Sequence, residues 1–258
     1  MKFLSRVIGG AFIIAILVAI TLIGRTALFI GVTVFSSIGL YEIRRCFKNM
    51  SYNFPLVLAL IFNLMIMITA FLNSNNLYIF VLVLITMITL VYMTFNKRYR
   101  PVDLAVMFFS LLYVSFLMSH MLRFNSTKYH WLLYIYAWGT DTFAYLVGSK
   151  IGKHKIELVS HISPNKTLEG SIGGVVGCLI LALIYNAYAN LGINVFLLIL
   201  FTIVCSILSQ IGDLIASFIK RKANVKDYGN LIMGHGGILD RFDSMLFISP
   251  IVYFITLI

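Results

Sequence analysis

The sequence predicts an all-α polytopic membrane protein with about nine transmembrane helices. Hydrophobic residues make up 60% of its 258 residues and charged residues only 11%, whereas soluble domains average about 45–50% and about 25%. The apolar residues form long continuous runs, unlike the short alternating segments of a transmembrane β-barrel. A disordered chain is also excluded, because such chains are poor in apolar residues and rich in charge.

Each predicted span is a run of about 20 mostly apolar residues, the length that crosses a bilayer as a helix. Polar turns separate the runs, as at 73–76 and 190–192, and Pro101 stands at the start of a span, where a helix tolerates proline. In chain order, the predicted spans are 7–23, 27–43, 54–72, 77–95, 102–121, 129–148, 170–190, 193–219 and 243–258.

The basic residues predict on which side of the membrane each loop lies. If the N-terminus is cytoplasmic, the inner segments carry 17 of the 20 Lys and Arg residues, and the outer segments carry only Arg25, Arg123 and Lys128. Cytoplasmic loops are enriched in Lys and Arg, so this split supports both the span count and the orientation. The same bias explains the net charge of +11 without a nucleic-acid partner.

We predict a single integral-membrane domain over residues 1–258. Residues 1–128 are apolar spans with short turns, and we expect them to form a helical scaffold. Residues 129–258 form the catalytic half, because they contain the two long loops, 149–169 and 220–242, that hold most of the polar chemistry. Both loops are cytoplasmic in the predicted topology. Glycine-rich spans allow a homodimer without requiring one.

Two carboxylates are predicted to lie inside spans. Asp141 lies in the sixth span, roughly 10 Å from its cytoplasmic end at 1.5 Å per residue, and Asp213 lies in the eighth. A carboxylate in a span costs on the order of 3 kcal/mol, so it usually faces a cavity or a partner. A hydrogen bond between packed helices or pairing with a buried Arg would also explain either residue. The Gly, Thr, Ser and Gln neighbours favour a functional site.

Asp240 and Asp243 stand three residues apart where the ninth span begins, a spacing that places them on one face of a helix. Acidic residues near a helix N-terminus also complement its dipole without any further role. Together with Asp141 and Asp213, they would form a group of carboxylates at similar depth. Such oxygen ligands suit Mg²⁺, which takes one or two carboxylates and fills its shell with water and phosphate oxygens.

The cytoplasmic loops also carry groups suited to phosphate. Lys220, Arg221 and Lys226 supply positive charge, and the glycines after His235 would let the backbone approach a phosphate closely. Alone, the basic run at 220–222 is equally typical of an anchor for anionic lipid headgroups. Thr167 would serve as the N-cap of the seventh span, with or without a further role. Gly170, Gly173, Gly174 and Gly177 indicate close helix packing rather than a nucleotide loop, and a Walker-type loop is absent from the sequence.

Three blocks of these residues resemble phosphatidate cytidylyltransferases, also called CDP-diacylglycerol synthases. The most specific block spans 27 residues and contains Ser217-Phe218-Ile219-Lys220-Arg221, Lys226-Asp227-Tyr228-Gly229 and His235-Gly236-Gly237-Ile238-Leu239-Asp240-Arg241-Phe242-Asp243. The others are Asp141-Thr142-Phe143-Ala144-Tyr145, with Gly148 and Gly152-Lys153-His154, and Ser163-Pro164 with Lys166-Thr167, Glu169-Gly170 and Gly173-Gly174. Met233, Asn165 and Leu168 depart from the family's usual Pro, Lys and Trp, which changes local loop rigidity and charge but removes no carboxylate.

The resemblance implies a nucleotidyltransferase of phospholipid biosynthesis. It would transfer the cytidylyl group of CTP to phosphatidate, giving CDP-diacylglycerol and pyrophosphate, from a multi-pass position in the cell (inner or plasma) membrane with its active site facing the cytoplasm. Mg²⁺, with K⁺ as a further ion, would be held by aspartates. We expect Asp213, Asp240 and Asp243 to bind the metal, Asp141 to be a further ligand or to lie just outside them, and His235 to contact the pyrophosphate leaving group. Phosphate binding is expected of Ser163, Lys166, Thr167, Lys220, Arg221, Lys226 and Arg241.

Three other functions fit parts of the sequence. A CTP-dependent lipid kinase, such as a polyprenol or phytol kinase, would share a similar nucleotide site, but the length of the matching block argues against it. A transporter could bind a cation at Asp141 and Asp213, although the two halves show no internal repeat. A structural lipid-binding protein would have no use for four clustered carboxylates.

Overall fold

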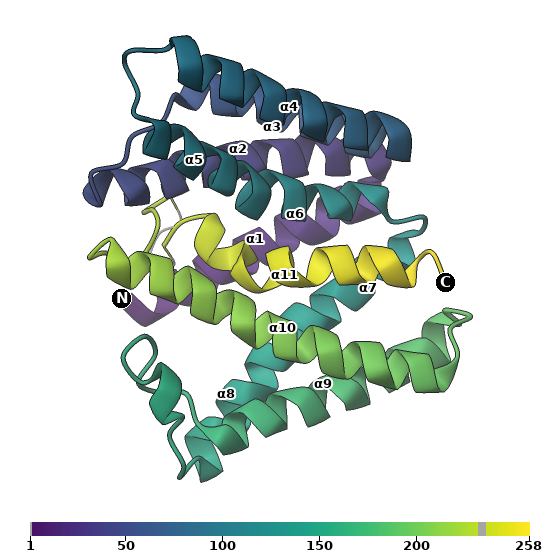
Figure 1. The fold of residues 1–258 in the computed structure, drawn as a ribbon. Helices are drawn as coiled ribbons and strands as arrows, with labels where there is room; N and C mark the ends of the chain where they lie inside the picture. Colours follow the sequence, from purple (N-terminus) through teal and green to yellow (C-terminus); the bar gives the residue numbers. More distant parts are fainter. Residues whose placement is uncertain (1, 232–235) are drawn as a thin grey trace. The chain divides into compact units, whose positions relative to one another are not determined.

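The computed structural model describes residues 2–231 and 236–258, with side chains from Ile13 onward within those ranges. This part of the chain is helical and contains no β-strand, only an isolated bridge between Lys155 and Thr167. The α-helices are α1 (Lys2–Ile23), α2 (Arg25–Asn49), α3 (Leu56–Phe71), α4 (Asn75–Phe95), α5 (Pro101–Ser110), α6 (Leu117–Ser119), α7 (Thr127–Tyr134), α8 (Thr140–Ile151), α9 (Leu168–Ala189), α10 (Val195–Lys222) and α11 (Leu239–Ile255) (Figure 1). Short π- and 3-10-helical turns are η1 (Leu111–Phe116), η2 (His120–Arg123), η3 (Ile135–Gly139) and η4 (Glu157–Val159).

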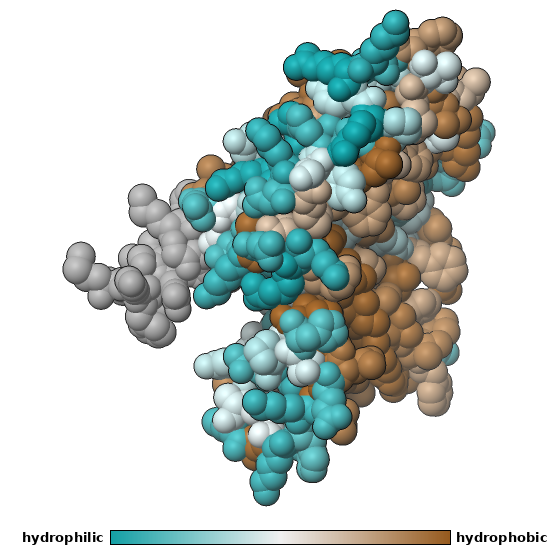
Figure 2. All heavy atoms as spheres, turned by 60° about the vertical axis from the view of Figure 1, so that its left-hand side comes forward, coloured by the Kyte–Doolittle hydropathy of each residue, from teal (hydrophilic) through white to brown (hydrophobic). Residues whose placement is uncertain are grey.

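The all-helical class predicted from the sequence is confirmed, and every predicted span overlaps a helical segment. Five segments of the described chain are long and apolar enough to cross a membrane: Arg25–Asn49, Asn75–Phe95, Pro101–Arg123, Leu168–Ala189 and Val195–Lys222. Large apolar side chains are exposed on them, with Phe95 79% and Tyr188 87% accessible. Figure 2 shows broad areas of hydrophobic surface of this kind. Exposed apolar surface on this scale suits contact with lipid.

Local signals in the sequence set the ends of several helices. The Ser74 hydroxyl accepts a hydrogen bond from the Leu77 N–H at the start of α4, and Pro101 occupies the first turn of α5. Asn190 adopts the left-handed conformation, with φ 47°, where α9 ends. The polar turns read from the sequence are therefore true helix boundaries.

The chain divides into two compact units. The first contains residues 1–123 and 222–241, and the second contains residues 124–221 and 242–258. In the first unit, α2 packs against α1, α3 and the π-helical turn η1. Segment 222–241, which joins α10 to α11, therefore belongs to the first unit although both helices lie almost wholly in the second.

In the second unit, α8 and α9 lie side by side along a stripe of glycines (Figure 1). A Cβ atom at Gly170 would lie 2.9 Å from the Ala144 carbonyl oxygen, and one at Gly174 would lie 3.0 Å from that of Thr140. Larger residues would therefore push the two backbones apart. The helix-packing interpretation of this motif is confirmed. Because the glycines contact α8 of the same chain, they give no support to the homodimer that glycine-rich spans would allow.

Candidate active site

Three of the predicted metal ligands belong to the second unit. Asp141 lies on α8 and is exposed, Asp213 lies half-buried on α10, and Asp243 lies on α11 with only 9% of its surface accessible. Asp213 and Asp141 act on the Asp243 carboxylate as like charges, and Lys220 acts on it as an opposite charge. The structure thus brings these groups within electrostatic range of one another.

The carboxylates do not form a closed metal-binding shell. Within the residues that the structure describes, no three His, Cys, Asp or Glu side chains converge closely enough to hold a metal ion. Two contacts explain why the three carboxylates are nevertheless neighbours. A Cβ atom on Gly212 would lie 2.7 Å from the Asp243 carbonyl oxygen, so a glycine lets α10 approach α11 right beside Asp213. The Thr140 hydroxyl donates to that of Ser206 at 2.9 Å, which ties α8 to α10 next to Asp141.

Lys166 lies directly against this group of carboxylates. Its Nζ atom is 2.6 Å from the Asp213 Oδ2 atom and donates to the Gln210 carbonyl oxygen at 3.3 Å. The Gln210 side chain in turn donates to the Ser171 carbonyl oxygen on α9 at 3.2 Å. The sequence predicted Lys166 as a phosphate contact, and the structure shows it as the counter-ion of a predicted metal ligand.

The loop that carries Lys166 is closed by hydrogen bonds between its two ends. The Leu168 N–H donates to the His154 carbonyl oxygen at 2.9 Å, and His154 Nδ1 lies 2.5 Å from Glu169 Oε1. The Glu169 carboxylate also accepts from the backbone N–H groups of Lys153 and His154. These hydrogen bonds fix where the loop joins the start of α9, and they therefore fix the position of Lys166.

Thr167 caps α9, since its Oγ1 atom accepts from the Gly170 N–H at 3.2 Å. The capping role predicted for Thr167 is confirmed, and a phosphate contact by Thr167 stays a prediction. Gly152 and Gly148 pack against this hydroxyl: a Cβ atom on Gly152 would lie 2.6 Å from it and one on Gly148 3.1 Å. Ser163 lies half-buried in the preceding turn, where its carbonyl oxygen accepts from the Lys166 N–H.

Asp240 belongs to the first unit and binds two backbone N–H groups there. Its Oδ2 atom accepts from the Tyr228 and Gly237 N–H groups, both at 2.9 Å. Gly236 has φ +84°, and a Cβ atom there would lie 2.7 Å from the same oxygen, so glycine is needed on two grounds. The Gly237 N–H is therefore directed at Asp240 rather than at an open phosphate site.

Glu42 on α2 is a residue that the sequence reasoning missed. Its carboxylate is 3% accessible and accepts from the Ile238 N–H at 3.0 Å and the Leu239 N–H at 2.8 Å. It thereby satisfies two of the unpaired donors where α11 begins. Gly229 and Gly237 both lie against this carboxylate with no room for a side chain. An acidic residue at the end of predicted span 27–43 was the available signal, the same one that identified Asp141 and Asp213.

The remaining predicted residues are divided between the two units. In the second unit, Lys220 is buried at 8% accessibility and Arg221 is exposed at the end of α10. In the first unit, Lys226 and Arg241 are exposed. His235 lies outside the described residues. In the first unit, Asp240 contacts backbone groups of its own segment. The second unit brings together other predicted residues of the site, namely Asp141, Asp213, Asp243, Lys166 and Lys220.

Comparison with known proteins identifies the family of the chain. The model of the cytidylyltransferase family matches residues 4–258. The chain is 33% identical over 265 aligned positions to a phosphatidate cytidylyltransferase of Bacillus subtilis, covering 97% of this chain and 96% of the relative. It is 40% identical over 181 residues to a protein of the same name from Staphylococcus haemolyticus, and 39% identical over 181 residues to one from Staphylococcus saprophyticus, with 69% of each chain covered. The chain therefore belongs to the cytidylyltransferase family.

Proposed function

We propose that this protein is a phosphatidate cytidylyltransferase. It transfers the cytidylyl group of CTP to phosphatidate and releases pyrophosphate, giving CDP-diacylglycerol. The observation that carries the proposal is the match to a relative of that name over 97% of the chain, together with the family match over residues 4–258. The carboxylates and basic groups collected in the second unit support it, because they are the groups that two phosphate-bearing substrates require.

The substrates determine where such a site must lie. CTP is soluble in water and phosphatidate is anchored in the bilayer, so the reaction takes place at a membrane surface. We place nine spans in the plasma membrane, with the N-terminus and both loops, 149–169 and 220–242, on the cytoplasmic side. The support for this orientation is the distribution of Lys and Arg, of which 17 of 20 fall in the inner segments.

The oxygen atoms of the candidate carboxylates are of the kind that magnesium prefers, although within the described residues no three candidate ligands converge on one point. Asp141, Asp213 and Asp243 present hard carboxylate oxygens, and Lys166 already holds a positive charge against Asp213. We propose that Asp213 and Asp243, with Asp141 and Asp240, hold Mg²⁺, and that K⁺ is a second ion for the same carboxylates. When bound, the divalent ion would neutralise phosphate charge that develops during the transfer.

The chain's own residues then align two phosphates. An oxygen of the phosphatidate phosphate attacks the α-phosphorus of CTP, a new P–O–P bond forms, and the bond to the pyrophosphate leaving group breaks. The lipid phosphate is itself the nucleophile, so no serine or cysteine nucleophile is required, and the three cysteines are buried. Lys166 and Lys220, which lie beside the carboxylates, hold the phosphates in line.

The activity can be tested with purified protein, labelled CTP and phosphatidate, with and without Mg²⁺. We expect labelled CDP-diacylglycerol and pyrophosphate in the presence of Mg²⁺, and neither in excess EDTA. A parallel reaction with a polyprenol and γ-labelled CTP tests the lipid-kinase alternative. A phosphorylated alcohol as the product, or full activity in EDTA, would contradict the proposal.

The cytoplasmic placement of both loops predicts a labelling pattern for introduced cysteines. In a variant lacking Cys46, Cys178 and Cys205, a cysteine at Ser160 or Asn230 is exposed at the protein surface. We expect both positions to resist a membrane-impermeant thiol reagent in intact cells and to react once the membrane is opened. Reaction of either in intact cells would overturn the topology.

Arg221 is predicted to contribute to catalysis rather than only to anchor the protein to lipid headgroups. A charge-assisted phosphate contact contributes about 1.5–3 kcal/mol, whereas a headgroup anchor contributes about 1 kcal/mol to membrane attraction. We expect Arg221→Ala to reduce kcat/KM roughly 10–200-fold in micelles, and Arg221→Lys to recover part of it, because ammonium lacks the bidentate fork. Wild-type turnover by Arg221→Ala in micelles would show that Arg221 is an anchor only.

A further inference from the structure

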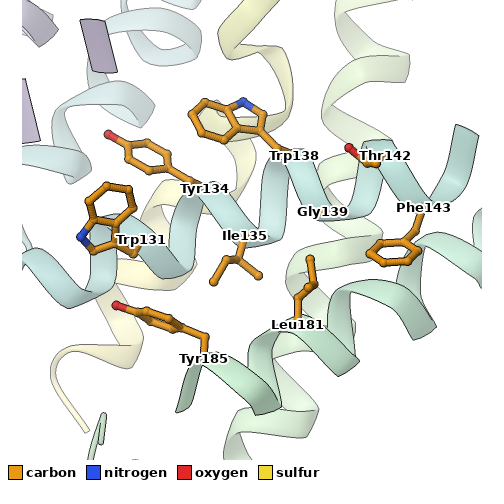
Figure 3. A pocket seen from close by; sticks show the side chains of 9 residues that line it. All are labelled: Trp131, Tyr134, Ile135, Trp138, Gly139, Thr142, Phe143, Leu181 and Tyr185. Atoms are coloured by element: carbon orange, nitrogen blue, oxygen red, sulfur yellow. The ribbon is translucent and has the colours of Figure 1, made fainter. Parts of the chain in front are cut away.

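The second unit contains an apolar groove that the proposed reaction does not use. It has a volume of about 450 Å³ and lies between the helical segment 127–151 and α9. Figure 3 shows Ile135 pointing toward the space between Tyr185 and Leu181 of α9, with Trp131 and Phe143 toward the two ends. Its walls are almost entirely aromatic and aliphatic, so its occupant must be apolar.

One end of the groove continues into a hollow with a positive charge. This hollow, of about 440 Å³, shares Trp131 and Tyr185 with the groove and adds Lys128 and Tyr188. The Lys128 Nζ atom donates to the carbonyl oxygens of residues 189 and 190, at 2.6 and 3.3 Å, where α9 ends. An ammonium group has three donors, and Lys128 is exposed, so it retains a donor for an acceptor outside the protein.

The opposite end of the groove is lined by uncharged residues. It reaches Thr142, the neighbour of the exposed Asp141 carboxylate. Among the residues that line the groove and the hollow, the positive charge lies at the Lys128 end, where an anionic headgroup would be attracted. Tyr and Trp side chains also gather near Lys128, as they do at membrane–water interfaces, where the ring is in the apolar region and its polar atom reaches water.

We propose that this groove binds one acyl chain of an anionic phospholipid whose headgroup phosphate is held by Lys128. The lipid is distinct from the substrate of the proposed reaction. Its headgroup lies at the start of the helical segment 127–151, whereas the loop that carries Lys166 follows the end of that segment. The proposal does not depend on the catalytic activity, and a protein without turnover would still bind this lipid.

Tryptophan fluorescence reports the occupant directly, because Trp131 and Trp138 are the two tryptophans of the chain and both line the groove. The experiment adds phosphatidylglycerol with brominated acyl chains to delipidated protein in detergent micelles. We expect quenching that saturates near one lipid per chain. Phosphatidylcholine with the same brominated chains should need a roughly fivefold higher concentration, the effect of one lysine on an anionic lipid.

Two pairs of variants test the groove and its charge separately. Leu181→Phe fills the groove and should abolish the saturable quenching, whereas Ile180→Phe, on an exposed position of the same helix, should not. Lys128→Gln should raise the half-quenching concentration of phosphatidylglycerol roughly fivefold, and Lys150→Gln, at the other end of the helical segment, should leave it unchanged. Quenching that rises with lipid content without saturating, and equally in Leu181→Phe, would overturn the site.

The orientation of the lipid is tested with Trp131→Phe and Trp138→Phe, which each leave one tryptophan. The two positions are seven residues apart, about 10 Å along a helix. Bromine near the headgroup should quench Trp131 more strongly, and bromine near the chain end should quench Trp138 more strongly.

The reverse order would place the headgroup beside Asp141 and identify the occupant as substrate. Loss of quenching at high protein concentration would identify a second copy of the chain. Either result overturns the proposal.

Discussion

Replacing Asp243 by asparagine is expected to reduce turnover at least about 100-fold without destabilising the fold. Asparagine keeps the size of the side chain and one acceptor, but it removes the charge that a divalent cation requires. The Asp243 carboxylate is nearly buried and lies near the like charges of Asp213 and Asp141. Removing its charge therefore removes both a desolvation cost and a repulsion. We therefore expect the Tm in detergent to be unchanged or higher while activity is lost.

The measurement is kcat and Tm of the purified variant over a range of Mg²⁺ concentrations. Glu157→Gln provides the control, because it also removes one carboxylate but from an exposed position in the loop before Lys166. Activity and stability that fall together in Asp243→Asn would indicate a structural role. Wild-type turnover would remove Asp243 from the proposed metal site.

Replacing Glu42 by alanine is expected to loosen the start of α11 and to reduce activity at least tenfold. The change leaves the N–H groups of Ile238 and Leu239 without their acceptor. Each unsatisfied buried donor costs about 1–3 kcal/mol, so the start of α11 should lose roughly 2–6 kcal/mol of local stability. Asp240, one residue further on, would then lose its fixed position. Glu42 thus acts as a positioning residue.

Hydrogen exchange separates this local effect from general destabilisation. We expect faster exchange at residues 237–240 in Glu42→Ala, with α8 and α9 unchanged. Glu42→Gln keeps one acceptor oxygen and should recover part of both protection and activity. Tyr41→Ala, at the neighbouring exposed position on α2, serves as the control. Unaltered exchange at 237–240 would show that the carboxylate does not hold the start of α11.

The helices were predictable because their signals are local. Run length and polar turns located the segments, and the spacing of Gly170, Gly173, Gly174 and Gly177 identified a packing face without reference to the partner helix. The two carboxylates within predicted spans were identified on the same basis. A charge within an apolar run is costly at any position, so Asp141 and Asp213 stand out from composition alone.

The contacts between distant segments were not predictable in this way. Glu42 binds backbone groups 196 and 197 residues further along the chain, and no local pattern relates a carboxylate on one helix to the start of another. The ion pair between Lys166 and Asp213 depends on how the loop ahead of α9 folds back. A sequence pattern indicates that a lysine is available for an anion, but only the folded loop determines which anion it meets.

The division of the chain between its two units limits how the protein could be produced as two separate fragments. A cut between Arg123 and Phe124 gives two continuous fragments, but segment 222–241 stays on the C-terminal one while its acceptor, Glu42, stays on the N-terminal one. The C-terminal fragment alone would carry buried backbone donors with nothing to receive them. Fragments cut at this point would have to be produced together, and their reassembly would restore a cap on α11 that neither fragment contains by itself.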